Sequence, residues 1–231
     1  MTVTQDCLKQ LENDSKLLER VVTKDKNLFF QYDPETKRKS QQWLSPGSAR
    51  PKIARMSKSK VKTMMICFFD SNGLEHKEFL SPGQTINQQF YIEVLERLRK
   101  RIVRVRPDIA NTWILHHDNT PCHRAFSVTQ FSTSKNITVL PQPPYSPDMS
   151  PYDFFLFSRI KQVIKKTHFD SVKDIQTSVT RVLQELPVND FQKSYENWKN
   201  RWTQCVAVQG EYIEGDHIDV PSFLSICDFF N

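Results

Sequence analysis

Three aspartates have the surroundings that point most directly to chemistry in this sequence. Asp118 follows an apolar run and so lies at the rim of a predicted sheet, while Asp153 stands near the start of a predicted helix. Asp25 lies within a predicted strand, where aspartate is disfavoured. Carboxylates brought close together repel unless a cation offsets them, and their hard oxygen atoms suit Mg²⁺ or Mn²⁺. Converging at one sheet edge, they could hold two ions about 4 Å apart for phosphoryl displacement.

Two of these aspartates also have a purely structural explanation. Asp118 and Asn119 can cap the turn that follows the strand. Asp153 fits the third position of a helix whose N-cap is Ser150 and whose first residue is Pro151, a pattern typical of helix starts. The sequence leaves both explanations open.

The neighbouring charged residues are interpreted as structural. Asp148, flanked by prolines, and Asp70, in the hairpin turn DSNG, are assigned to turns. Lys24 and Lys26 adjoin Asp25, and strand alternation turns their side chains to the opposite face. We therefore expect both lysines to stay out of the metal-binding face at Asp25, and an ammonium next to the site could still perturb it.

Other reaction classes lack their motifs. The sequence has no HExxH, and the adjacent His116 and His117 must point to opposite faces of a strand, which disfavours a zinc hydrolase. It has no GxGxxG, P-loop or GxSxG motif. Its five cysteines form no CxxC, which favours reduced thiols, and no apolar run approaches the roughly 18 residues of a membrane span.

The predicted elements give an α/β domain with a mixed sheet, an antiparallel meander plus parallel strands, flanked by helices. Strands are expected at 21–32, 41–43, 61–70, 74–80, 112–118 and 137–140. Helices are expected from a Thr85–Gln88 cap to Pro107 and at about 123–132, 151–166, 171–186 and 189–206. We expect one domain over residues 1–216 with an exposed basic loop at 45–60, followed by a tail at 217–231.

Positive charge is concentrated in two places. The chain has a formal net charge of +6, and residues 50–62 and 97–106 hold six Lys or Arg each. Such clusters favour contact with phosphates, although a solvated face explains them equally well. The candidate DNA-binding residues are Arg50, Lys52, Arg55, Lys58, Lys60, Arg97, Arg101 and Arg104. Aromatic residues along 191–202 share one helical face and are predicted to be core rather than a base-stacking platform.

Two motifs at a fixed separation resemble the catalytic core of mariner-type transposases. These are HHDNTPCH and LPQPPYSPDMSPYDFFLF, which place thirty-four residues between Asp118 and Asp153. The family uses that spacing between its second and third catalytic aspartates, and Asp25 in VVTKDKNLFF aligns with the first. The similarity extends over roughly residues 7–216.

The resemblance implies an RNase H-like fold and a nuclear enzyme that cleaves DNA and transfers strands. Asp25, Asp118 and Asp153 would be catalytic and would bind two Mg²⁺ ions, with Mn²⁺ as a substitute. The implied partners are transposon ends, target DNA and a second copy of the chain, with no membrane. The loop at 45–60 would correspond to a clamp that reaches a partner subunit.

The sequence departs from the family in two respects. Lys24 and Lys26 stand where the family has Gly and Glu, and the chain begins where the catalytic domain begins, without the helix-turn-helix modules that read transposon ends. The expectation is therefore a truncated transposase, domesticated or a remnant. The alternative is a catalytically inactive module that binds DNA or a protein partner.

Overall fold

A five-stranded mixed sheet forms the centre of the protein, with strand order β3-β2-β1-β4-β5. The structure is a computed structural model that describes residues 2–34, 57–165 and 167–210. The strands are β1 (Val21–Phe30), β2 (Lys62–Asp70), β3 (Gly73–Phe79), β4 (Ile114–His116) and β5 (Thr138–Leu140). The β1–β2 and β2–β3 pairs are antiparallel, whereas β1–β4 and β4–β5 are parallel. The predicted mixed sheet is confirmed.

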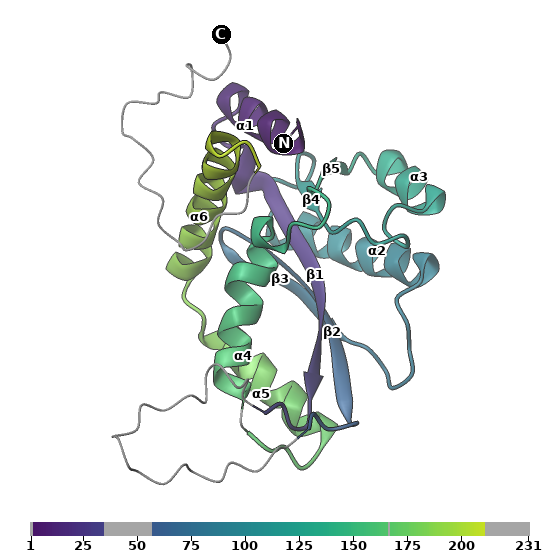
Figure 1. The fold of residues 1–231 in the computed structure, drawn as a ribbon. Coiled ribbons are helices and arrows are strands. Elements are labelled where there is room, and N and C mark those ends of the chain that lie inside the picture. Colours follow the sequence, from purple (N-terminus) through teal and green to yellow (C-terminus); the bar gives the residue numbers. More distant parts are fainter. Residues whose placement is uncertain (1, 35–56, 166, 211–231) are drawn as a thin grey trace, which may run out of the picture.

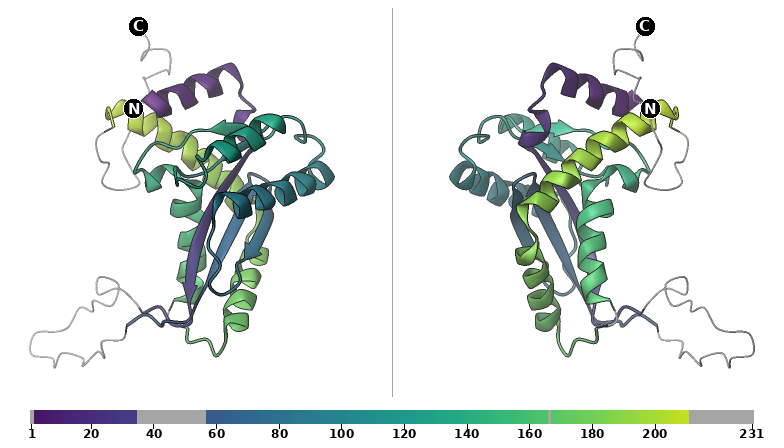
Figure 2. Two further views of the ribbon diagram at one scale, coloured as in Figure 1. Left: turned by 90° about the vertical axis from the view of Figure 1, so that its right-hand side faces the viewer. Right: turned by 90° about the vertical axis from the view of Figure 1, so that its left-hand side faces the viewer.

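Helices cover both faces of this sheet (Figure 1). They are α1 (Thr2–Asn13), α2 (Gln88–Val105), α3 (Phe126–Ser134), α4 (Ser158–Ile164), α5 (Val172–Glu185) and α6 (Val188–Ala207). Shorter helical turns are η1 (Leu17–Arg20), η2 (Pro147–Met149) and the π-helical η3 (Tyr152–Phe157). Helices α2 and α3 pack on one face, and α1, α4, α5 and α6 on the other, with α1 against α6 (Figure 2).

Aromatic side chains of α6 fill the core on one face of the sheet. Trp198 and Trp202 are almost completely buried, with ring centroids 4.8 Å apart. The hydroxyl of Tyr195 donates to the carbonyls of Val21 and Phe69 at 2.8 and 3.2 Å, which ties α6 to β1 and β2. The prediction that these aromatics are core rather than a stacking platform is confirmed.

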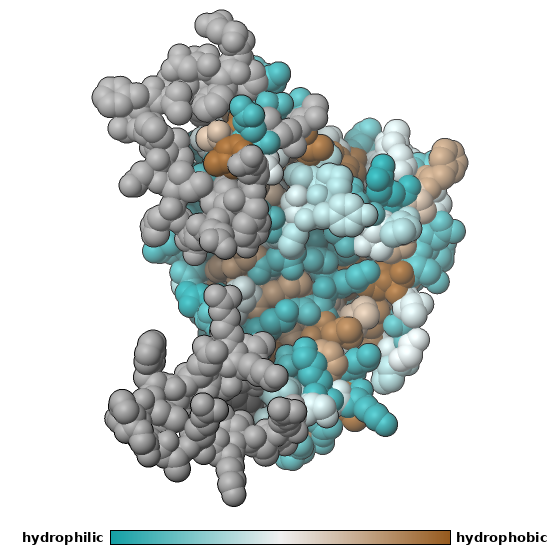
Figure 3. All heavy atoms as spheres, viewed as in Figure 1, coloured by the Kyte–Doolittle hydropathy of each residue, from teal (hydrophilic) through white to brown (hydrophobic). Residues whose placement is uncertain are grey.

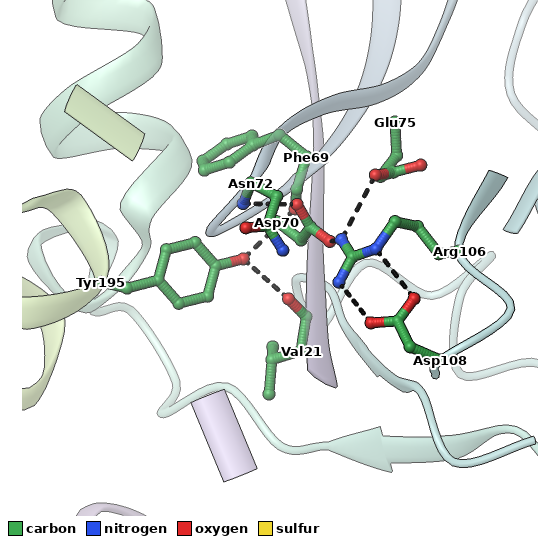
Figure 4. A network of polar contacts seen from close by, with 8 residues as sticks. All are labelled: Val21, Phe69, Asp70, Asn72, Glu75, Arg106, Asp108 and Tyr195. Atoms are coloured by element: carbon green, nitrogen blue, oxygen red, sulfur yellow. Dashed lines mark hydrogen bonds and ion pairs between the residues drawn. The ribbon is translucent and has the colours of Figure 1, made fainter. Parts of the chain in front are cut away.

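A buried ion network closes the β2–β3 hairpin and confirms a structural role for Asp70 (Figure 4). Asp70 is fully buried and pairs with Arg106, which follows α2 and also lies 3.6 Å from Glu75. The Asn72 backbone N–H donates to the Asp70 carboxylate at 2.7 Å, as a hairpin-turn aspartate requires. Asp108 completes the network at 3.1 Å from the Arg106 guanidinium.

Of the predicted caps of α2 and α5, the first differs from the structure and the second is confirmed. The N-cap of α2 is Asn87, whose side chain accepts from the Phe90 N–H at 2.9 Å, so the predicted Thr85–Gln88 cap lies too early. At α5 the Ser171–Asp174 pair forms a complete capping box as expected. In α2, Asn87 is the N-cap because its amide oxygen accepts a hydrogen bond from the backbone N–H of the third helical residue, Phe90.

Replacing Ser171 by Ala is expected to lower the free energy of unfolding by about 1 kcal/mol, the usual loss for an N-cap. Lys173→Ala, an exposed change in the same first turn, leaves the cap in place and is the matched control. Urea unfolding followed by circular dichroism measures both. Equal stability of the two variants would show that the capping box contributes nothing.

Several expectations concern residues outside the described part of the chain. The short strand predicted at 41–43, most of the basic loop and the tail at 217–231 lie there. In the described ranges no helix is long and apolar enough to cross a membrane. On the face drawn in Figure 3, hydrophilic and hydrophobic residues are interspersed over the described surface.

Candidate active site

The three aspartates singled out in the sequence line one cavity. Asp25 comes from β1, Asp118 follows β4, and Asp153 lies in η3 at the start of the helix that continues as α4. The cavity has a volume of about 490 Å³. Because β1 and β4 are parallel neighbours, the carboxyl end of β4 at His116 pairs with Thr23, two residues before Asp25 in β1. The sheet topology therefore produces the convergence that the sequence could only suggest.

Asp25 is half-buried and electrostatically costly. Its carboxylate accepts a hydrogen bond from the Lys26 backbone N–H at 2.6 Å. Burial raises the pKa of Asp25 to about 6, with opposition from the charge of Lys24 and the Lys26 N–H, and a further rise from Asp118 and Asp153. This carboxylate is thus in electrostatic contact with the other two.

Asp118 is held in its ionised form by its neighbours. It accepts hydrogen bonds from the His123 ring nitrogen Nδ1 and from the Thr120 hydroxyl. Burial acts to raise the pKa of Asp118, but the His123 hydrogen bond and the positive charge of Lys24 outweigh it and hold the pKa well below its usual range. The turn after β4 therefore presents a fixed negative charge.

Asp153 is not a helix cap of the predicted kind. Its N–H donates to the Ser150 carbonyl at 3.0 Å, but the Ser150 hydroxyl forms no cap, and the first turns are π-helical. In a π-helix residues five apart align, and Tyr152 and Phe157 meet edge to face at 4.2 Å in the core. Burial raises the pKa of Asp153, Lys161 lowers it, and Asp118 raises it further.

Lys24 contradicts the expectation that it stays out of the site. Strand alternation does turn it away from Asp25, but its ammonium lines the same cavity and is 1 % exposed. It lies 2.8 Å from His123 Nε2 and 4.9 Å from the centre of the Tyr91 ring. Alternation fixes the face from which a side chain leaves a strand, whereas the long lysine stem carries the charge to the sheet edge.

The two histidines before Asp118 point apart as predicted. His116 shares a hydrogen bond with the Thr23 hydroxyl at 3.0 Å and packs on Trp198, while His117 shares one with the Tyr91 hydroxyl at 2.7 Å. Burial lowers the pKa of both, to about 4 and about 2 respectively, so both are neutral at pH 7. Their side chains pack in the core on opposite faces of the sheet and do not line the cavity.

The donor types fit a hard divalent ion, but their present contacts are with protein groups. Three carboxylates line the cavity, and such oxygen donors suit Mg²⁺ and Mn²⁺. Within the described ranges, however, no three His, Cys, Asp or Glu side chains are grouped closely enough to hold a metal ion as they stand. A metal ion would use the remaining lone pairs of Asp118, while His123 and Thr120 hold its carboxylate in place.

Some of the candidate DNA-binding cations are paired with carboxylates in the structure, and others are exposed. Arg97 binds Glu78 through two hydrogen bonds of 2.7 and 2.8 Å, and Lys58 lies 3.4 Å from Asp33. Arg104 and Lys60 are exposed. Arg101 is partly buried, with its Nε atom unpaired. The remaining candidates, Arg50, Lys52 and Arg55, lie outside the described residues.

Three residues beside the aspartates had not been expected from the sequence. Arg124, Tyr145 and His123 adjoin the carboxylates, the first two as part of the cavity wall. Tyr145 is fully exposed and has a positive φ of 54°, which a tyrosine rarely adopts. The sequence signal for two of them was the run HHDNTPCHR, in which His123 and Arg124 follow Asp118 by five and six residues.

The sheet order and the carboxylates that line its edge define an RNase H-like domain. The family model described as transposase (partial DDE domain) matches residues 33–112. The chain is 30% identical over 200 residues to the mariner Mos1 transposase of Drosophila mauritiana, covering 85% of this chain and 57% of that protein. It is 26% identical over 204 residues to the human histone-lysine N-methyltransferase SETMAR, covering 87% of this chain and 29% of that one.

Solved structures give the same result. A pre-cleavage Mos1 transpososome aligns with a TM-score of 0.84 and 28% identity, over 92% of this chain and 62% of that chain. The catalytic domain of Mos1 mariner transposase aligns with a TM-score of 0.76 and 26% identity, over 92% and 93%. These findings show that the chain is a homologue of the mariner Mos1 transposase and that it matches the catalytic domain of that protein. It spans little more than half of the first relative's length and less than a third of the second's.

Proposed function

We propose that this domain is a metal-dependent DNA nuclease and strand transferase of the mariner type. Asp25, Asp118 and Asp153 would hold two Mg²⁺ ions, with Mn²⁺ as a substitute. Those ions would supply the positive charge that stabilises the attacking and leaving oxygens of a phosphodiester. The observation that carries the proposal is the convergence of the three carboxylates in one cavity. Mos1 structures that were solved with Mn and with Mg support it.

The protein's own groups would orient the site. His123 and Thr120 fix the Asp118 carboxylate from two sides. The Asn119 side chain donates to the Gln142 carbonyl at 2.7 Å and ties the turn to the proline-rich segment. Arg124 adds a cation where a DNA phosphate would enter.

The proposed substrate and setting follow from the same relatives. The Mos1 structures include paired-end complexes with DNA, which supports DNA as the partner of this chain and a homodimer as its working form. Cleavage would proceed by hydrolysis of one phosphodiester, after which the released 3′-hydroxyl attacks target DNA. Such a protein would act in the nucleus.

The second candidate is a module that binds DNA or protein without catalysis. The match to a protein named as a histone-lysine N-methyltransferase favours it, because the same domain occurs there beside another activity. The buried ammonium of Lys24 among the carboxylates also favours it.

Incubation with supercoiled plasmid separates the two candidates. The enzyme is expected to produce open circles in Mg²⁺ or Mn²⁺ and none in EDTA, whereas the module shifts the plasmid's mobility without nicking it. Retained binding with no nicking in either metal would reject the nuclease proposal.

Replacing Arg104 by Ala is expected to reduce the slope of log affinity against log salt for duplex DNA by about 1, the loss of one phosphate contact. Arg97→Ala is the matched control on the same helix and is expected to change the slope less, because Glu78 already neutralises Arg97. Fluorescence anisotropy at several salt concentrations measures both. A larger change for Arg97 than for Arg104 would contradict this assignment.

A further inference from the structure

A buried ammonium lies among the proposed metal-binding carboxylates. Lys24 is 1 % exposed and lines the same cavity as Asp25, Asp118 and Asp153. A buried lysine normally requires a charge partner, since the loss of hydration is costly. No carboxylate is in direct ion pairing with its nitrogen among the described residues, and its nearest polar partner is His123 at 2.8 Å.

The hydrogen-bond chemistry makes His123 a bridge between the two charges. An ammonium has only donors, so Lys24 donates to His123 Nε2, and the single ring proton of a neutral imidazole then lies on Nδ1. That proton is donated to the Asp118 carboxylate. The order ammonium, imidazole, carboxylate gives each member a hydrogen-bond partner and fixes the histidine tautomer.

The surroundings keep the ammonium in this place. Nζ of Lys24 lies 4.9 Å from the centre of the Tyr91 ring, a favourable position for a cation, and that ring lies 4.1 Å from the His123 ring. Tyr91 and its hydroxyl partner His117 are both buried. These contacts enclose the ammonium, whereas that of a surface lysine is free to change its position.

We infer that Lys24 is a built-in cation of the carboxylate site, which offsets Asp118 and Asp25 and weakens the binding of divalent metal ions there. The inference rests on the proposed metal site. Its ammonium supplies positive charge to the same carboxylates that a metal ion would neutralise, and two cations so close repel each other. The Asp118 oxygens also accept hydrogen bonds from His123 and Thr120, which leaves fewer free lone pairs for an incoming ion.

Lys24→Met tests the inference, because methionine keeps the length and burial of the side chain and removes its charge. We expect Mn²⁺ affinity to rise roughly 10- to 100-fold, since a charge within about 4–6 Å shifts carboxylate equilibria by 1–3 pKa units. Lys26→Met, on the same strand face, is the matched control. The Lys26 charge acts on His123 and Lys24, but this side chain is only partly buried and, among the described residues, has no hydrogen bond or ion pair with Asp118, so we expect its replacement to change the affinity less than about twofold. Electron paramagnetic resonance of unbound Mn²⁺ gives the affinity without any assay of activity.

Two safeguards keep the test decisive. Lys24→Gln removes the same charge and replaces Lys24→Met if circular dichroism shows that the methionine variant does not fold. If wild type and the Lys24 variant bind Mn²⁺ equally tightly, the role of Lys24 is overturned and the metal site stands. Absence of Mn²⁺ binding in both would overturn the metal site itself and the inference with it.

Discussion

Asp153→Asn is expected to lower metal-dependent plasmid nicking by roughly 10²- to 10⁴-fold, the usual cost of removing a charged group that acts at the reacting centre. Asp153 lines the cavity with Asp25 and Asp118, and its charge is felt by Asp25. The π-helical turn leaves its side chain out of any cap, so the carboxylate is available to the site. Asparagine keeps the shape and removes the charge that a metal ion needs.

Asp148→Asn is the matched control for this prediction. Asp148 lies five residues earlier in the same proline-rich segment, is exposed, and is absent from the cavity wall. Both changes remove one negative charge, so a general effect of charge on DNA binding would appear in both. Equal nicking by the Asp153 variant and wild type, or equal losses in the two variants, would remove Asp153 from the site.

Arg106→Met is expected to lower the free energy of unfolding by about 3–5 kcal/mol, the cost of leaving buried partner charges uncompensated. Asp70 is completely buried and Glu75 is only 5 % exposed, so water cannot replace the lost guanidinium as their partner. Arg104→Met, two residues earlier and exposed, is the control and should change stability by less than about 0.5 kcal/mol. Urea unfolding at pH 7 measures both variants.

The stability lost in Arg106→Met should also depend on pH. Burial already raises the pKa of Asp70 and of Glu75, and removal of the guanidinium raises both further. A carboxyl whose folded pKa exceeds its unfolded value is destabilising once it must ionise, so the deficit grows as the pH rises through the folded pKa and shrinks below the unfolded one. A deficit that is as large at pH 4 as at pH 8 would contradict burial of unpaired carboxylates as its cause.

The sequence predicts well wherever a local pattern determines the outcome. The alternation and turn of the β2–β3 hairpin, the Ser171–Asp174 cap and the buried aromatic face of α6 are all local patterns, and all are confirmed. The RNase H-like fold is also confirmed, but its prediction depended on the resemblance carried by the two motifs, since spacing alone fixes no topology. Assignment of the three aspartates to catalysis stays a prediction.

The features that were missed depend on contacts between distant segments. Alternation placed Lys24 on the correct face, but nothing in the sequence shows that Tyr91 and His123 from other elements enclose its ammonium. The π-helical turn of η3 was likewise hidden, because it follows from packing of Tyr152 against Phe157 rather than from any capping signal. In both cases tertiary packing overrides the local pattern.

The central claim is that the three converging carboxylates make a metal-dependent site for DNA cleavage. Comparison of wild type with Asp118→Ala on supercoiled plasmid, in Mg²⁺ and in Mn²⁺, tests it most directly. We predict open-circular product from wild type and only the metal-free background from a folded Asp118→Ala variant that still binds DNA. The same background from both proteins, or the same nicking rate from both, would contradict the claim.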